Sequence, residues 1–272
     1  MCLGLLLGEA MKAFQQDLGV MFLAFSFLGV AVDPSSALAY RTTDYTPGYK
    51  AIAPLSALDA RALFDRAVMY DKGQGVPQDR AEAVRWYRQA AEQGLSVAQY
   101  NLAQMYSRGD GVAQDRSEAF RWYQLSAKQG LAEAQYNLGM IYYDGTGVPQ
   151  DYAEARKWFQ LAAVQGDPDA QNNLGAIYSL GKGVPPDYRE ALYWYGLAAN
   201  QGDPIAQYNI GSMYALGQGT SRDYVQAHFW FGLAAQQGDH DARQMRDRLA
   251  AKMTPGQLTA AQKLVQEWRP TR

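Results

Sequence analysis

The apolar and polar positions of this chain recur five times at a spacing of 36 residues. Each copy carries an Asp, a Trp seven residues later and a Gly eight residues after the Trp. The copies are Asp79, Trp86 and Gly94; Asp115, Trp122 and Gly130; Asp151, Trp158 and Gly166; Asp187, Trp194 and Gly202; Asp223, Trp230 and Gly238. A fixed period of roughly 20 to 50 residues is typical of a solenoid, in which each unit buries its apolar face against its neighbours.

The stretch from each Asp to the following Gly has the pattern of an α-helix, called helix B. In the first copy, apolar residues at i, i+3, i+4, i+7 and i+8 form one stripe: Ala83, Trp86, Tyr87, Ala90 and Ala91. The Asp and the Glu or Gln three residues later predict a reciprocal capping box, worth about 1 kcal/mol per helix. The final Gly permits the left-handed conformation that ends a helix. The tryptophans are predicted to pack in the core.

A second helical pattern, helix A, precedes each helix B. Ala98, Leu102 and Tyr106 recur as Ala134, Leu138 and Tyr142, and onward through the chain. Helix A ends at a Gly-x-Gly loop, where glycines permit positive φ and let the chain turn back. Ser56 together with Asp59 is predicted to cap the first helix A. The unit is therefore an antiparallel helical hairpin, and the fold class is predicted to be all-α.

The motifs A-x-W-[YF]-x-x-A-A-x-Q-G, A-Q-x-N-L-G-x-x-Y and G-x-G-V-x-x-D resemble the Sel1-like repeat family from about Ala60 to Gly238. The copies depart from the pattern at Arg66, where Leu is usual, and at Asn172, which stands where the second copy has Tyr100. Members resemble tetratricopeptide proteins. The resemblance implies a right-handed α-solenoid of five repeats over residues 56–238, and an adaptor rather than an enzyme.

The two ends of the chain differ from the repeats. Lys12 precedes an apolar run, and Ala37-Leu38-Ala39 supplies small residues at a cleavage site. Residues 1–39 are therefore predicted to be a secretory signal peptide that is cut after Ala39, with Met11 as the preferred start. The mature protein would be periplasmic or secreted, without stable membrane insertion. The alternative is an uncleaved inner-membrane anchor.

Residues 40–55 lack helical periodicity and are predicted to form an extended lead-in, either a disordered linker or a segment docked on the solenoid. Residues 239–272 are predicted to form capping helices. Charged residues there replace the apolar positions of the repeats, and Thr254 with Gln257 forms a capping box that opens the last helix.

Composition argues against several functions. The chain has 25 Lys and Arg against 27 Asp and Glu, and no basic run interleaved with aromatics, so nucleic acid is not a predicted partner. Two histidines and one cysteine, Cys2, give no metal-site spacing, and neither a metal nor a cofactor is predicted. Ser179 to Lys182 matches the S-x-x-K of penicillin-interacting serine enzymes, but neither K-T-G nor S-D-N accompanies it. Because of the S-x-x-K match, a cell-wall enzyme or lactam binder is the alternative function.

The positions of helix A that change between copies are predicted to bind the partner. Positions that pack between identical repeats should keep the same residue in every copy. Positions that recognise an irregular partner should instead differ between copies. At 100° per residue these positions fall on one face, and solenoid curvature usually makes one helix layer a concave groove. We call this surface the helix A face; its alternative is an ordinary solvated surface. The predicted contacts are Tyr100, Gln104, Arg108, Tyr136, Met140, Asn172 and Tyr208.

One asparagine per repeat follows the edge of the helix A face: Asn101, Asn137, Asn173 and Asn209. Their amides can donate to and accept from a peptide backbone. The alternative is that each Asn bonds to the neighbouring repeat and fixes the stack. These patterns predict a surface that binds a partner protein or peptide. The family resemblance implies a non-catalytic scaffold of the bacterial envelope, for instance one that regulates a membrane sensor or envelope assembly.

Overall fold

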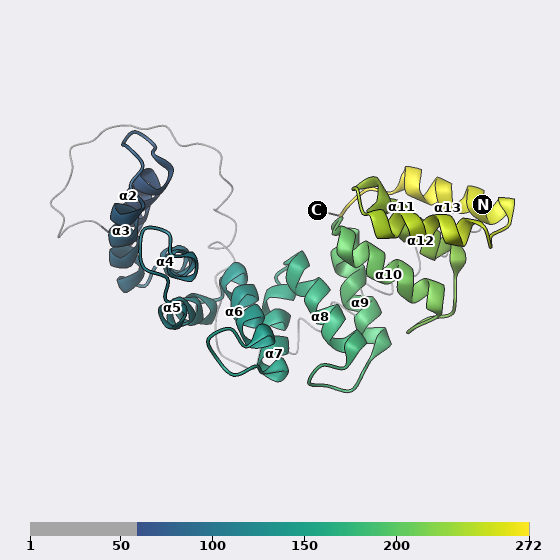
Figure 1. The fold of residues 1–272 in the computed structure, drawn as a ribbon, viewed down its shortest axis with the longest axis horizontal. Coiled ribbons are helices and arrows are strands. Elements are labelled where there is room, and N and C mark those ends of the chain that lie inside the picture. The colour runs from purple at the N-terminus through teal and green to yellow at the C-terminus, as the bar shows by residue number, and fades with distance from the viewer. Residues whose placement is uncertain (1–58, 272) are drawn as a thin grey trace. The chain divides into compact units, whose positions relative to one another are not determined.

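The computed structural model describes residues 59–271, which form twelve helices and no strand (Figure 1). The predicted signal peptide, residues 1–39, and the lead-in, residues 40–55, lie outside the described residues. The helices are α2 (Ala60–Lys72), α3 (Arg80–Glu92), α4 (Ser96–Arg108), α5 (Arg116–Lys128), α6 (Ala132–Asp144), α7 (Tyr152–Ala163), α8 (Pro168–Leu180), α9 (Tyr188–Asn200), α10 (Pro204–Leu216), α11 (Tyr224–Gln236), α12 (His240–Ala250) and α13 (Pro255–Glu267). No helix in this part of the chain is long and apolar enough to span a bilayer.

The helices pair as predicted. The A helices are α2, α4, α6, α8 and α10, and the B helices are α3, α5, α7, α9 and α11. Each helix A packs on helix B of its own repeat, and each helix B from α3 to α9 packs on helix A of the next repeat. This succession of hairpins (Figure 1) confirms the all-α solenoid.

The predicted N-caps are present, but the reciprocal capping boxes at the aspartates are not. Asp79 Oδ1 accepts from the backbone N–H of Glu82 at 3.0 Å, and the other four B helices begin in the same way. The backbone N–H of each N-cap Asp donates instead to a carbonyl of the preceding helix A, for example Asp115 to Tyr106 at 2.9 Å, so the glutamates bond elsewhere. Glu118, for example, accepts from Arg121 and from the indole of Trp122. Only Thr254 and Gln257, among residues 59–271, form both halves of the box.

The N-cap of the first helix A is Asp59 and not Ser56. Asp59 is itself the N-cap of α2 and accepts from the N–H of Ala62 at 2.8 Å, while Ser56 lies outside the described residues. The departure at Arg66 also has a place in the packing, since its guanidinium lies 4.2 Å from the ring centre of Trp86. A cation over an indole face is favourable, so Arg66 contributes to the packing of Trp86.

The core agrees with the predicted apolar stripes except at Trp158 and at helix A tyrosines such as Tyr142, which are half-buried. Of the five tryptophans at the repeated position, four are only 4–7% exposed: Trp86, Trp122, Trp194 and Trp230. Trp158, in the central repeat, is only half-buried, and the fully buried side chain there is its neighbour Phe159. The aromatic centre of the central repeat is therefore Phe159.

A row of buried glutamines ties consecutive repeats together. Gln99 donates to the backbone carbonyl of Ala91 at 3.1 Å and accepts from Gln129 at 2.8 Å, so its amide bridges the carboxyl ends of two B helices. Both bonds recur in the next three repeats, at Gln135, Gln171 and Gln207. Buried amides need such partners, and a Gln in this place fixes the spacing of adjacent hairpins.

The last two helices break the pattern of the repeats. Both α12 and α13 pack on α11, so that α13 lies against the last helix B. Leu264, Val265 and Trp268 pack against the core of the last repeats, and the N–H of Thr271 donates to the carbonyl of Asn200 at 2.8 Å.

Candidate protein-binding surface

The predicted contact residues all lie on A helices, namely α4, α6, α8 and α10. Ten of the eleven are half-buried, and Arg108 is exposed. Half-buried side chains have one part in the core and one part at the surface, so each residue of the helix A face has to be assigned by its contacts.

The tyrosines of this face pack on helix B of their own hairpin. The ring centre of Tyr100 lies 5.9 Å from that of Tyr123, Tyr136 lies 5.9 Å from Phe159, and Tyr208 lies 5.4 Å from Phe231. Burial raises the pKa of the Tyr100 and Tyr136 hydroxyls, which therefore stay protonated at neutral pH. The predicted separation of helix A into a packing face and a recognition face is incomplete at these positions.

The asparagines reach toward the preceding repeat. Asn137 and Asn173 each donate through Nδ2 to a carbonyl of their own helix, at 2.7 and 2.9 Å, and each also interacts with a tyrosine hydroxyl of the preceding repeat, Tyr100 and Tyr136. In the fourth repeat, where Asn172 replaces the tyrosine, Asn209 Nδ2 donates to its Oδ1 at 3.2 Å. These contacts supply what the stacking alternative requires, while the half-buried amides keep a polar edge along the helix A face.

A hollow of about 330 Å³ opens at the N-terminal end of this face, between α2, α3 and α4. It brings together three predicted residues, Asn101, Gln104 and Arg108, with charged residues that the sequence did not single out. The full lining is Val68, Asp71, Lys72, Arg80, Tyr87, Asn101, Gln104, Met105, Arg108 and Asp110. Tyr100 does not line it, and the other predicted residues, from Tyr136 to Asn209, lie farther along the solenoid.

Ion pairs organise the charges around the hollow. Arg80 lies 3.3 Å from Asp110 and 3.9 Å from Asp71, and Lys72 lies 3.0 Å from Asp71. Gln104 Nε2 donates to the Tyr100 hydroxyl at 2.6 Å, which leaves its amide oxygen as an acceptor. The hollow therefore offers donors, acceptors and both signs of charge, as an extended peptide requires.

The residues of the S-x-x-K motif have separate partners. The Ser179 hydroxyl hydrogen-bonds Tyr195, whereas Lys182 Nζ donates to the Tyr143 hydroxyl at 2.6 Å. That bond raises the pKa of the Lys182 ammonium, and a general base must instead be neutral. This arrangement does not favour a nucleophilic serine. Across residues 59–271, no group of three His, Cys, Asp or Glu side chains is placed to hold a metal ion.

Comparisons with known proteins identify the repeat. The Sel1 repeat pattern matches residues 60–95, 96–131, 132–167, 168–203 and 204–239. A search of curated proteins finds no match. Among solved structures, a Sel1 repeat protein from Oxalobacter formigenes is 35% identical with a TM-score of 0.66, covering 80% of this chain and 91% of that one.

Two further solved structures are similar. A protective antigen of uropathogenic Escherichia coli is 26% identical with a TM-score of 0.40, covering 77% of this chain and 61% of that one. A Sel1 repeat protein from Klebsiella pneumoniae subsp. pneumoniae is 24% identical with a TM-score of 0.43, covering 70% of this chain and 93% of that one. With five matched copies over residues 60–239, the chain belongs to the Sel1 repeat family.

Proposed function

We propose that this chain is a non-catalytic scaffold of the bacterial envelope that binds a partner protein or peptide on its helix A face. Sel1 repeats in general mediate protein–protein binding and typically carry no catalytic activity. The observation that carries the proposal is the polar hollow at the N-terminal end of the helix A face, where Asn101, Gln104 and Arg108 converge.

An extended peptide would use this surface in two ways. The amides of Asn101 and Gln104 can pair with the peptide backbone, which gives affinity without reading the sequence. Arg108 can pair with an acidic side chain of the partner, since it is exposed and belongs to no ion pair found in residues 59–271. Side chains that differ between repeats would then set the order of partner residues along the solenoid.

A paired substitution tests this assignment. Gln104→Ala with Arg108→Ala should weaken partner binding about tenfold or more, because each change removes a polar contact of about 1 kcal/mol or above. Folding should be preserved, since Gln104 is half-buried and Arg108 exposed. The measurement is the amount of partner recovered after crosslinking in intact cells.

The matched control is Arg85→Ala with Arg121→Ala on the B helices. Both arginines are exposed, and each forms an ion pair with a glutamate three residues earlier; Arg121 also lies 4.2 Å from the ring centre of Trp122. If the partner binds the A helices, the control variant should leave the amount of recovered partner unchanged. Loss of binding in the control alone would move the partner site to helix B. Tyr100→Phe with Tyr136→Phe, which keeps the ring packing, reports the contribution of the two hydroxyls.

Export is part of the proposal and rests on the sequence. Cleavage after Ala39 should give a mature chain that begins at Tyr40, because small residues precede that bond and the apolar run is short. Mass spectrometry of periplasmic protein gives the N-terminus directly. An intact N-terminus in the membrane fraction would instead support the uncleaved anchor.

A further inference from the structure

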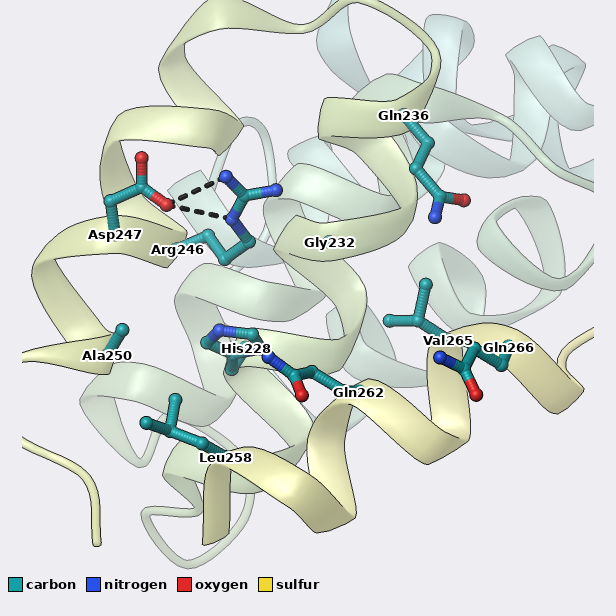
Figure 2. Close-up of a pocket in the computed structure, with 10 residues that line it drawn as sticks. All are labelled: His228, Gly232, Gln236, Arg246, Asp247, Ala250, Leu258, Gln262, Val265 and Gln266. Carbon is teal, nitrogen blue, oxygen red and sulfur yellow. Dashed lines mark hydrogen bonds and ion pairs between the residues drawn. The ribbon is translucent and has the colours of Figure 1, made fainter. Parts of the chain in front are cut away.

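A second cavity, of about 420 Å³, lies among α11, α12 and α13, and none of the predicted contact residues of the helix A face lines it (Figure 2). Its floor is one stripe of α11 at i, i+4 and i+8: His228, Gly232 and Gln236. Its walls are Arg246, Asp247 and Ala250 of α12, and Leu258, Gln262, Val265 and Gln266 of α13. The wall residues belong to α12 and α13, which follow the five matched repeats. The packing of α13 on α11 closes the cavity.

His228 is the least expected residue in this cavity. Its side chain is 6% exposed, and its buried Nδ1 has no hydrogen-bond partner. Leaving a buried polar atom unpaired costs roughly 1–3 kcal/mol, so native structures seldom do it without a function. The same position in the earlier repeats holds Val84, Phe120, Arg156 and Leu192. Arg156 Nε, at the equivalent position, is unpaired as well, so the unpaired Nδ1 does not by itself indicate a ligand. His228 nevertheless lines the cavity, and because Nδ1 is buried, a ligand there would meet the imidazole through the rest of its ring.

Arg246 supplies a cation at the same cavity. Its Nε and Nη2 both donate to Asp247 Oδ1, at 2.9 and 2.7 Å (Figure 2). Asp247 is the next residue in the chain, and its side chain is 62% exposed, whereas that of Arg246 is 31% exposed. Such an exposed pair contributes little, and a guanidinium carries five N–H donors. A carboxylate that enters the cavity can therefore join or replace Asp247.

The rest of the lining suits an apolar body. Leu258 and Val265 present aliphatic surface from α13, and Gly232 and Ala250 leave room beside it. The glutamine amides at positions 236, 262 and 266 can orient a polar head. Small-molecule sites typically measure roughly 300–1,000 Å³ and combine an apolar lining with a few polar groups, and this cavity fits that description.

We propose that the cavity among α11, α12 and α13 binds a small organic acid, with its carboxylate at Arg246 and His228 and its apolar body against Leu258 and Val265. Burial and the nearby Arg246 lower the pKa of His228, with the Asp247 carboxylate opposing them, so the ring is neutral at pH 7 and can donate one N–H to a carboxylate. This site is independent of the partner site on the helix A face.

Octanoate is the probe for this proposal. Calorimetric titration of the full chain should show saturable binding of one octanoate per chain. Octan-1-ol keeps the apolar body without the carboxylate, and acetate keeps the carboxylate without the body; each should bind at least about tenfold more weakly. Absence of saturable octanoate binding, or equal binding of octan-1-ol, would overturn the proposal.

Two arginines of α12 provide matched variants. Arg246→Gln should weaken octanoate binding about tenfold or more, whereas Arg248→Gln should not change it, because Arg248 is exposed and does not line the cavity. Equal affinities for the two variants would contradict the assignment.

A measurement on the unmodified chain keeps the test valid if Arg246→Gln unfolds. Octanoate should shift the NMR signals of the Gly232 amide and of the Gln262 and Gln266 side-chain amides. The Gly139 amide, in the central repeats, should not respond. Shifts confined to other parts of the chain would place the binding elsewhere and overturn the proposal.

Discussion

Phe159→Ala should lower the free energy of unfolding by about 3–5 kcal/mol, the usual cost of emptying a large buried aromatic site. Phe159 is fully buried in α7, and its ring centre lies 5.9 Å from that of Tyr136 and 6.2 Å from that of Tyr143. The helix A residue Gly139 also lies against this ring, since a Cβ there would be 2.6 Å from it. The cavity would therefore open between α6 and α7 in the central repeat, where a solenoid depends on contacts between neighbours.

Urea unfolding followed by far-UV circular dichroism measures this loss. The control is Leu161→Ala in the same helix, which should cost no more than about 0.5 kcal/mol because Leu161 is 42% exposed. Trp158→Ala should fall between the two, since its indole is only half-buried. Equal losses for Phe159→Ala and Leu161→Ala would show that the central repeat is not held together by this ring.

The fold could be predicted because each of its local determinants recurs. An Asp every 36 residues starts a helix, a left-handed Gly ends it, and the apolar stripe between them can be buried only against another hairpin. The partner of Glu118 could not be predicted in the same way. In the folded hairpin the cap N–H of Asp115 donates to the carbonyl of Tyr106, and the Glu118 carboxylate accepts from Arg121 and Trp122 instead.

The candidate site could be predicted from the sequence only in part, for a similar reason. Helical spacing places Tyr100, Gln104 and Arg108 on one face, but it does not say how far a half-buried ring leans toward helix B. The buried glutamines left a signal that could have been used, a Gln at the same place in four consecutive copies. No sequence pattern predicted the cavity beside His228, because the packing of α13 on α11 forms it.

The loops give the other large effect. Gly111→Ala should destabilise the chain by at least about 2 kcal/mol more than Gly130→Ala, because the two glycines share a strained φ and differ in their surroundings. Gly111 has φ +69° and Gly130 has φ +93°, and an added Cβ costs about 1–2 kcal/mol in this region of φ. At Gly130 that Cβ would meet nothing within 4 Å, whereas at Gly111 it would lie 2.4 Å from the backbone C and O of Arg80.

The excess cost at Gly111 should appear where two repeats meet. The clash is with backbone at the start of α3, so the loop after α4 has to move away from the preceding repeat, and the 3.3 Å ion pair between Arg80 and Asp110 would be lost with it. Thermal unfolding gives the difference in stability. Hydrogen exchange of the Gly111→Ala variant should show lost protection first in α2 and α3, because within residues 59–271 only one hairpin packs on them. Equal stabilities of the Gly111→Ala and Gly130→Ala variants would mean that the loop can shift without loosening the stack.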